Sequence, residues 1–290
     1  MSGSNINLTQ FSIESNTKSV VEILKTSQKR KESQKSAKIK AVYTDATIKK
    51  MSSNLYNALN DRCKYESVVD LQSIYDNKDI GIDNYEKYES LCISLFTHDF
   101  KKAEYNLYSE KILSRHVCQY CYVQSVNALD HYIEKAKFPE LSILPDNLIP
   151  ICTNCNSTKK DNFVYPYFNI LQNSEWLGCT VNSDQTFRFS ISKEVASNEF
   201  EKKILIDLRN QFDTLKIFDK YIKSGQATVT DRFSMIKIFK ETGKKRDDTK
   251  NFFEESDIKT NKILLSNTEF YLIAIRKAII KNFYNIWDAL

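Results

Sequence analysis

The sequence predicts a mainly α-helical protein with a small cysteine-rich module in its middle and a short β-hairpin after that module. Only five glycines and four prolines occur in 290 residues, which is far below the usual share and argues against a loop-rich β fold. Apolar residues recur three and four positions apart on both sides of the module, as in helices. A hydrophobic content of 41% is enough to bury real cores.

Residues 1–110 are expected to form a basic N-terminal segment followed by an α-helical region. The first 45 residues are polar, rich in Ser and Lys, and lack the apolar core of a signal peptide. Helical periodicity then appears over 47–63, 65–76 and 88–115. No run approaches the roughly 18 apolar residues of a membrane helix, so we expect a cytoplasmic protein.

Positive charge is concentrated near the N-terminus. Between Lys29 and Lys50, eight Lys or Arg residues stand against two acidic ones, whereas residues 111–175 carry six of each sign. A basic run of this kind can supply the nonspecific grip on a polyanion, with Lys29, Arg30 and Lys31 at its start. A solvated helix face or tail accounts for the same run equally well.

Residues 171–290 are predicted to form a β-hairpin and an α-helical C-terminal domain. The segment 178–192 alternates apolar and polar residues on either side of "NSDQ", which favours a hairpin. A helix is expected from 199 until Gly225 stops it, and two more over 228–243 and 267–290. The last helix is apolar over much of its circumference, so it either closes the domain's own core or meets another chain.

Four of the seven cysteines lie in the middle module, residues 111–170, as two CxxC pairs. Thirty residues separate the pair Cys118 and Cys121 from the pair Cys152 and Cys155. In a reducing compartment such pairs indicate metal ligands rather than disulfides, and four thiolates make the closed tetrahedral shell of a structural zinc ion. A redox dithiol is the competing interpretation, but its usual βαβ context is missing.

The residues between and just after the cysteine pairs carry a second pattern, formed by "LDHY", "PDNLIPIC" and "NCNSTKK". This combination resembles the HNH endonuclease family, in which two CxxC knuckles often clamp a ββα-metal fold. The three positions that give the family its name map onto His131, Asn147 and Asn156, which makes this chain an HNN variant. The turn after "LDHY" lacks the glycines that the family often shows there.

The resemblance implies metal-dependent hydrolysis of DNA phosphodiester bonds. His131 would be the general base, since an imidazole with a reference pKa of ~6.5 is mostly neutral at physiological pH. Asp130 and Asn156 would hold one Mg²⁺ or Mn²⁺ ion through hard oxygen atoms, and Asn147 would brace the loop of His131.

Further DNA contacts are expected from Lys159 and Lys160, on the first turn of the helix that follows the second cysteine pair. For Lys160, simple solvent exposure is the preferred interpretation, because most surface lysines contact only water.

The alternative function is a zinc-stabilised nucleic-acid-binding or scaffold protein without nuclease activity. The complete set of Asp130, His131, Asn147 and Asn156 favours the enzyme, because a binding module has no use for a base beside a metal ligand. By resemblance, HNH proteins of this size stand beside an ATPase or sensor subunit in bacterial restriction or antiviral defence. Such a partner, or a homo-oligomer formed through residues 198–290, is therefore expected.

Overall fold

The computed structural model describes residues 117–290, apart from 136–140, 143, 160–162, 173 and 267–268. The helices expected within 1–110 and the basic residues Lys29, Arg30 and Lys31 lie outside the described residues. The chain divides into two compact units. Of the described residues, 127–151 belong to the first unit, and 117–126 together with 152–290 belong to the second.

The described part of the first unit is a two-stranded antiparallel hairpin. Strand β1, Ala128–His131, pairs with β2, Leu148–Ile151, so that Asp130 lies opposite Ile149 and His131 opposite Leu148. The run "LIPI" in β2 is apolar and entirely buried, as expected of a strand packed on both faces. A 3-10 turn, η5 (Pro145–Asn147), leads directly into β2.

The second unit begins with the two cysteine knuckles and then forms the hairpin predicted around "NSDQ". The short helix α8, Thr153–Thr158, follows the second knuckle, and the 3-10 turn η6 spans Asn169–Leu171. Strands β3 (Leu177–Val181) and β4 (Phe187–Ile191) pair antiparallel. Asp184 caps the connecting turn by accepting hydrogen bonds from the backbone N–H and hydroxyl of Thr186.

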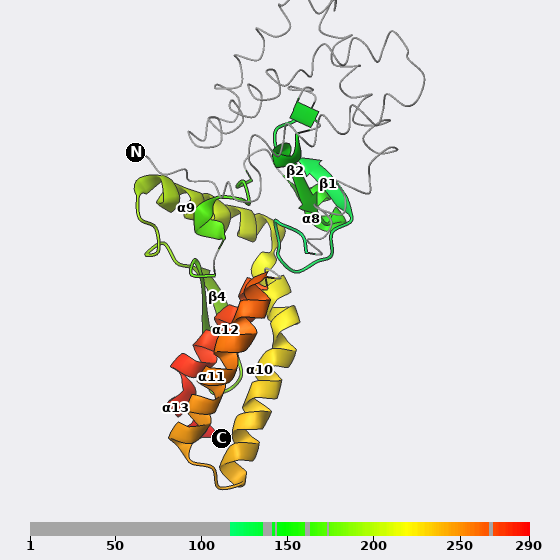
Figure 1. The fold of residues 1–290 in the computed structure, drawn as a ribbon. Coiled ribbons are helices and arrows are strands. Elements are labelled where there is room, and N and C mark those ends of the chain that lie inside the picture. Colours follow the sequence, from blue (N-terminus) through cyan, green and yellow to red (C-terminus); the bar gives the residue numbers. More distant parts are fainter. Residues whose placement is uncertain (1–116, 136–140, 143, 160–162, 173, 267–268) are drawn as a thin grey trace, which may run out of the picture. The chain divides into compact units, whose positions relative to one another are not determined.

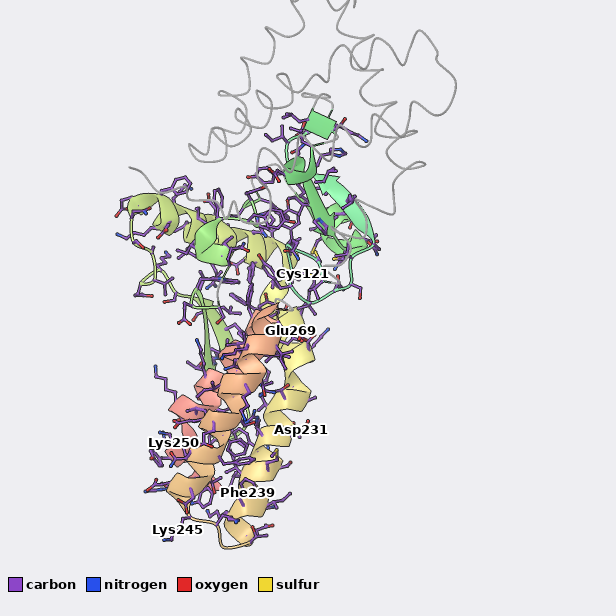
Figure 2. All side chains as sticks on the ribbon, viewed as in Figure 1. Cys121, Asp231, Phe239, Lys245, Lys250 and Glu269 are labelled. Atoms are coloured by element: carbon purple, nitrogen blue, oxygen red, sulfur yellow. The ribbon has the colours of Figure 1, made fainter. Side chains whose placement is uncertain are left out.

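The remainder of the second unit is helical, which confirms the predicted fold class (Figure 1). Five helices follow β4: α9 (Glu199–Leu215), α10 (Ile217–Glu241), α11 (Arg246–Ser266), α12 (Phe270–Lys281) and α13 (Phe283–Ala289). Helix α11 runs back alongside α10, while α12 packs against β3 and α10. Figure 2 marks Lys245 at the connection between α10 and α11, and Glu269 directly before α12.

The expectation that Gly225 ends the first C-terminal helix is wrong. Helix α9 ends at Leu215, ten residues before Gly225. Lys216, the next residue, adopts a left-handed conformation with φ 50°. Helix α10 then runs through Gly225 without interruption. A Cβ atom at Gly225 would lie 2.3 Å from Cδ1 of Ile275 on α12, so the missing side chain permits close helix packing rather than a stop.

The helices expected over 228–243 and 267–290 are present with different bounds. The first is the second half of α10, and the last is divided into α12 and α13 at Asn282. Phe270, Ile275 and Ile279 are buried in the core of their own unit, so this apolar segment closes its own domain. Helix α11 was not predicted. Among the described residues, no helix is both long enough and apolar enough to span a membrane.

Candidate metal centre and nuclease site

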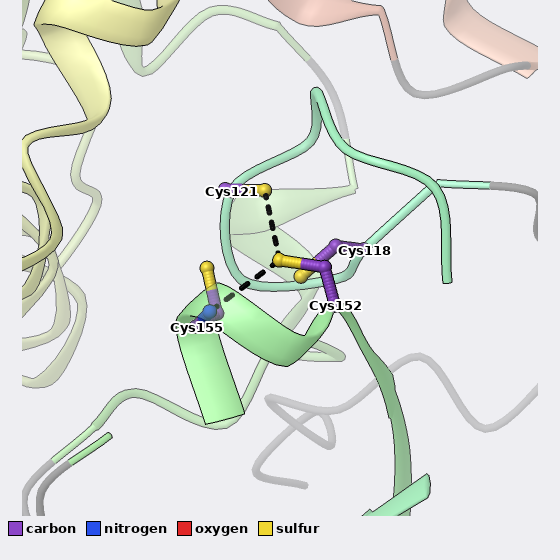
Figure 3. A group of neighbouring side chains, drawn as sticks. All are labelled: Cys118, Cys121, Cys152 and Cys155. Carbon is purple, nitrogen blue, oxygen red and sulfur yellow. Dashed lines mark hydrogen bonds between the residues drawn. The ribbon is translucent and has the colours of Figure 1, made fainter. Parts of the chain in front are cut away.

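The first knuckle is a tight turn around Cys118 and Cys121. The backbone N–H of Tyr122 donates to the carbonyl oxygen of Cys118 at 2.8 Å, and the N–H of Cys118 donates to the carbonyl of Gln124 at 2.8 Å. Tyr122 has a left-handed backbone with φ 54°, which costs a residue other than glycine on the order of 1–3 kcal/mol. The turn thereby directs both thiols to one side (Figure 3).

The second knuckle is the start of α8. Cys152 caps this helix, and its sulfur accepts a hydrogen bond from the backbone N–H of Cys155 at 3.4 Å. Its thiol also lies 3.0 Å from Oε1 of Gln124 in the first knuckle. The helix therefore places Cys155 beside Cys152 one turn later, as a CxxC ligand pair requires.

All four cysteines meet in one cluster. Their sulfur atoms lie within 4.8 Å of one another, and all four residues are buried (Figure 3). Hydrogen bonding with the Cys118 thiol lowers the pKa of Cys121 to about 7 and also lowers the pKa of Cys152. Hydrogen bonding with Cys121 raises the pKa of Cys118, and hydrogen bonding with Cys118 raises that of Cys155.

The donor set of this cluster fits a thiophilic cation. Four buried sulfur atoms at mutual distances below 4.8 Å match a tetrahedral four-thiolate shell, for which zinc is the usual ion. Binding would require every thiol to lose its proton, so metal loading and proton release would be linked. The structure thus brings together the two CxxC pairs that the sequence indicated.

The imidazole of His131 is oriented by a backbone carbonyl. Its Nε2 lies 3.0 Å from the carbonyl oxygen of Ser142, which can only accept a hydrogen bond. Nε2 therefore carries the proton in the neutral ring, and the lone pair is on Nδ1. His131 is half-buried at the end of β1, whereas Ser142 is fully buried.

Asn147 is fully buried and makes three hydrogen bonds to the backbone of the segment between the strands. Its Oδ1 accepts from the N–H of Ile133 at 2.7 Å, and its Nδ2 donates to the carbonyl oxygens of Ile133 and Leu141 at 3.1 Å each. Its own carbonyl accepts from the N–H of Tyr132 at 2.8 Å. The side chain therefore ties Ile133 and Leu141, two points of the segment between the strands, to the residue directly before β2.

The structure does not show the remaining predicted site residues together in one site. Asp130 is half-buried on β1 of the first unit, and Asn156 is exposed on α8 of the second, so an ion shared by these two residues stays a prediction. Lys159 caps the C-terminal end of α8, not its first turn, because the helix begins at Thr153 and has only six residues. Lys160 lies outside the described residues.

Comparison with known proteins identifies the module. Residues 118–162 match the sequence model of the HNH endonuclease family. The chain contains an HNH endonuclease domain. Along the chain, the HNH domain has the order β1, β2, α8 of the expected ββα-metal module.

A curated relative of the chain is more distant. "Protein ea31" of Escherichia phage lambda is 25% identical over 142 residues, which are 42% of this chain and 47% of that protein. The chain thus spans about half the length of the curated relative it matches. No solved structure matches it significantly.

Two residues of the HNH domain were not predicted from the sequence. Ser142 contributes its backbone carbonyl to His131, and a backbone contact leaves no signal in residue type. Tyr122 follows the first cysteine pair in a left-handed conformation that tyrosine seldom adopts, so its conformation could not be read from its side chain either.

Proposed function

We propose that this chain is a metal-dependent endonuclease that hydrolyses DNA phosphodiester bonds, with His131 as the general base. The observation that carries the proposal is the hydrogen bond between Nε2 of His131 and the carbonyl of Ser142, inside a domain of the HNH endonuclease family. Because Nε2 keeps its proton, Nδ1 is the ring atom that accepts a proton from water.

In the proposed step, a water molecule attacks phosphorus while Nδ1 of His131 takes one of its protons. The bond between phosphorus and the leaving oxygen breaks, and that oxygen takes a proton from solvent. A divalent Mg²⁺ or Mn²⁺ ion, when bound, neutralises charge on the phosphoryl group and the leaving oxygen. Asp130 and Asn156 would hold it through carboxylate and amide oxygens.

Asn147 acts as a positioning residue in this proposal. Its Nδ2 donates to the carbonyl of Leu141, and the next carbonyl along the chain, that of Ser142, is the acceptor of His131. Fixing residue 141 therefore fixes the group that selects the tautomer of the base. This contact supports the role that the family resemblance assigns to Asn147.

The cysteine cluster has a structural role in the proposal. Cys118, Cys121, Cys152 and Cys155 would hold one zinc ion, and a shell of four thiolates leaves no open position for water or substrate. The catalytic ion and the structural ion are therefore different ions with different ligands.

Contacts to DNA outside the site remain part of the proposal. Lys159 at the end of α8, Lys160, and the basic run that starts with Lys29, Arg30 and Lys31 would meet phosphates. By the family resemblance, the setting that we propose is bacterial restriction or anti-phage defence. An ATPase or sensor partner, or self-association, would then restrain the nuclease.

The test is plasmid cleavage by the purified chain with Mg²⁺ or Mn²⁺, compared with a His131→Ala variant. Loss of the base should slow cleavage by about 10²–10⁴-fold. Zinc content and thermal melting should stay close to those of the unsubstituted protein, because His131 is half-exposed. A His98→Ala variant, at a histidine with no assigned role, should cut normally. Equal cleavage by His131→Ala would contradict the proposal.

A further inference from the structure

The first knuckle is part of the helical body. Residues 117–126 belong to the same compact unit as residues 152–290. Tyr122, directly after Cys121, is buried, and its ring centroid lies 5.1 Å from that of Phe270 on α12 and 6.1 Å from that of Trp176. The knuckle therefore contacts the core directly.

The partners of Tyr122 are central to that core. Trp176 is fully buried just before β3, with ring centroids 5.7 Å from those of Phe212 on α9 and Phe270 on α12. Both contacts are edge-to-face, the arrangement that aromatic rings prefer. Tyr122 thus connects the cysteine turn directly to Trp176 and Phe270, and through Trp176 to Phe212 on α9.

The joint between the two knuckles is weak without a cation. Thiol contacts link them: Sγ of Cys121 lies 4.0 Å from Sγ of Cys152, and Cys152 lies 3.0 Å from Oε1 of Gln124. Thiols are weak donors and acceptors. Metal binding would replace the thiol protons, and one cation shared by four thiolates would join the knuckles far more strongly than these thiol contacts do.

We propose that metal loading of the four-cysteine cluster is coupled through Tyr122 to the packing of the C-terminal helical core. With zinc bound, the knuckle holds the Tyr122 ring against Trp176 and Phe270. When zinc leaves, the knuckle relaxes from its left-handed turn, Tyr122 withdraws, and the core around Trp176 loosens. The metal-loaded cluster would then stabilise the second unit, which contains neither His131 nor the residues that position it.

Tryptophan fluorescence of the full chain tests this coupling. The chain has two tryptophans, and Trp287→Phe leaves Trp176 as the single emitter. Stripping zinc from this protein with EDTA should shift Trp176 emission to longer wavelength, increase its quenching by acrylamide and lower the melting temperature. Added zinc should reverse all three changes. Unchanged emission and melting in protein shown to be metal-free would overturn the proposal.

Substitutions at Tyr122 test the path. Tyr122→Gly removes the ring while accommodating the left-handed backbone, so it should still bind one zinc per chain but show little change in Trp176 emission on stripping. Tyr122→Phe keeps the ring and should respond like the parent, as should Tyr284→Ala on α13. A Tyr122→Gly protein with the full parental response would refute a role for Tyr122. If this variant fails to fold, the EDTA experiment on the parent still decides. None of these readouts depends on DNA cleavage.

Discussion

Asn147 binds backbone groups of the segment that follows the proposed base, His131. Asn147 satisfies one buried donor and two buried acceptors of the segment that follows His131. Buried backbone groups that lose such partners cost about 1–3 kcal/mol each. The family resemblance predicted a bracing role for Asn147, but the groups it braces could not be predicted, because they are backbone atoms of Ile133 and Leu141.

Asn147→Ala should destabilise the hairpin by on the order of 3 kcal/mol, since several buried backbone groups lose their partners. Hydrogen exchange at the backbone N–H of Ile133, measured by NMR, should become much faster. DNA cleavage should fall as well, because the carbonyl that orients His131 would be less fixed. Asn210→Ala, at an exposed position of α9, should change neither the hydrogen exchange of Ile133 nor DNA cleavage. Continued protection of the Ile133 amide in Asn147→Ala would count against this account.

One residue separates α9 from α10. Lys216 is the C-cap of α9 and the N-cap of α10, with φ 50° and ψ 47°. A left-handed conformation costs an L-residue roughly 1–2 kcal/mol, and glycine avoids most of this cost. Lysine gives no sequence signal for such a break, which is why a continuous helix was predicted.

Lys216→Gly should therefore stabilise the protein by about 1 kcal/mol in urea unfolding, after allowance for the greater freedom of glycine in the unfolded chain. Lys223→Gly is the matched control. Lys223 is exposed within α10, where glycine should cost up to about 1 kcal/mol. Equal destabilisation by the two substitutions would show that the left-handed backbone at Lys216 carries no strain.

Gly225 and Ile275 should show strong energetic coupling between α10 and α12. Gly225→Ala gains about 1 kcal/mol of helix propensity but places its Cβ 2.3 Å from Cδ1 of Ile275, and such overpacking costs about 1–3 kcal/mol. Ile275→Val removes Cδ1 and alone should cost about 1 kcal/mol. The double variant should be more stable than the sum of the single changes predicts, by about 1 kcal/mol or more. Additive values from unfolding curves would contradict this packing.

Local sequence patterns were sufficient to predict the β3–β4 hairpin but not helix α11. The β3–β4 hairpin was predicted from the alternation over 178–192 on either side of "NSDQ", and the apolar residues Val181, Phe187 and Phe189 of this segment are buried. Helix α11 gave no clear apolar stripe, since two of its buried residues, Thr249 and Asp257, are polar. The hydroxyl of Thr249 bonds to the carbonyl of Lys245 one turn earlier, whereas Asp257 pairs with Arg232 and Arg276, which are distant in sequence. A local pattern cannot reveal the contacts of Asp257.

The second unit is held together by charge as well as by apolar packing. Asp257 of α11 bonds with Arg232 of α10 and, at 2.8 Å, with Arg276 of α12. The guanidinium of Arg232 also lies 4.8 Å from the ring centroid of Phe253. Burial lowers the pKa of Arg232, and the carboxylate of Asp257 opposes this effect.

Asp257→Asn should destabilise the second unit by about 3–5 kcal/mol, because two largely buried guanidinium groups lose their counter-charge. Thermal and urea unfolding measure this loss. Asp213→Asn breaks the exposed pair with Arg209 on α9 and should cost less than about 1 kcal/mol. If the two substitutions had equal effects, the buried cluster would contribute no more than a surface ion pair.

The contacts of Tyr122 also limit the order in which the second unit can fold during synthesis. Ribosomes release the chain from its N-terminus, so the first knuckle emerges long before its partners. Cys118 and Cys121 must wait for Cys152 and Cys155, and the Tyr122 ring must wait until Phe270 has emerged. Contacts between such distant residues form late and slowly. The core on which the knuckle rests is therefore completed only after α12 has been synthesised, and an interrupted product would lack it.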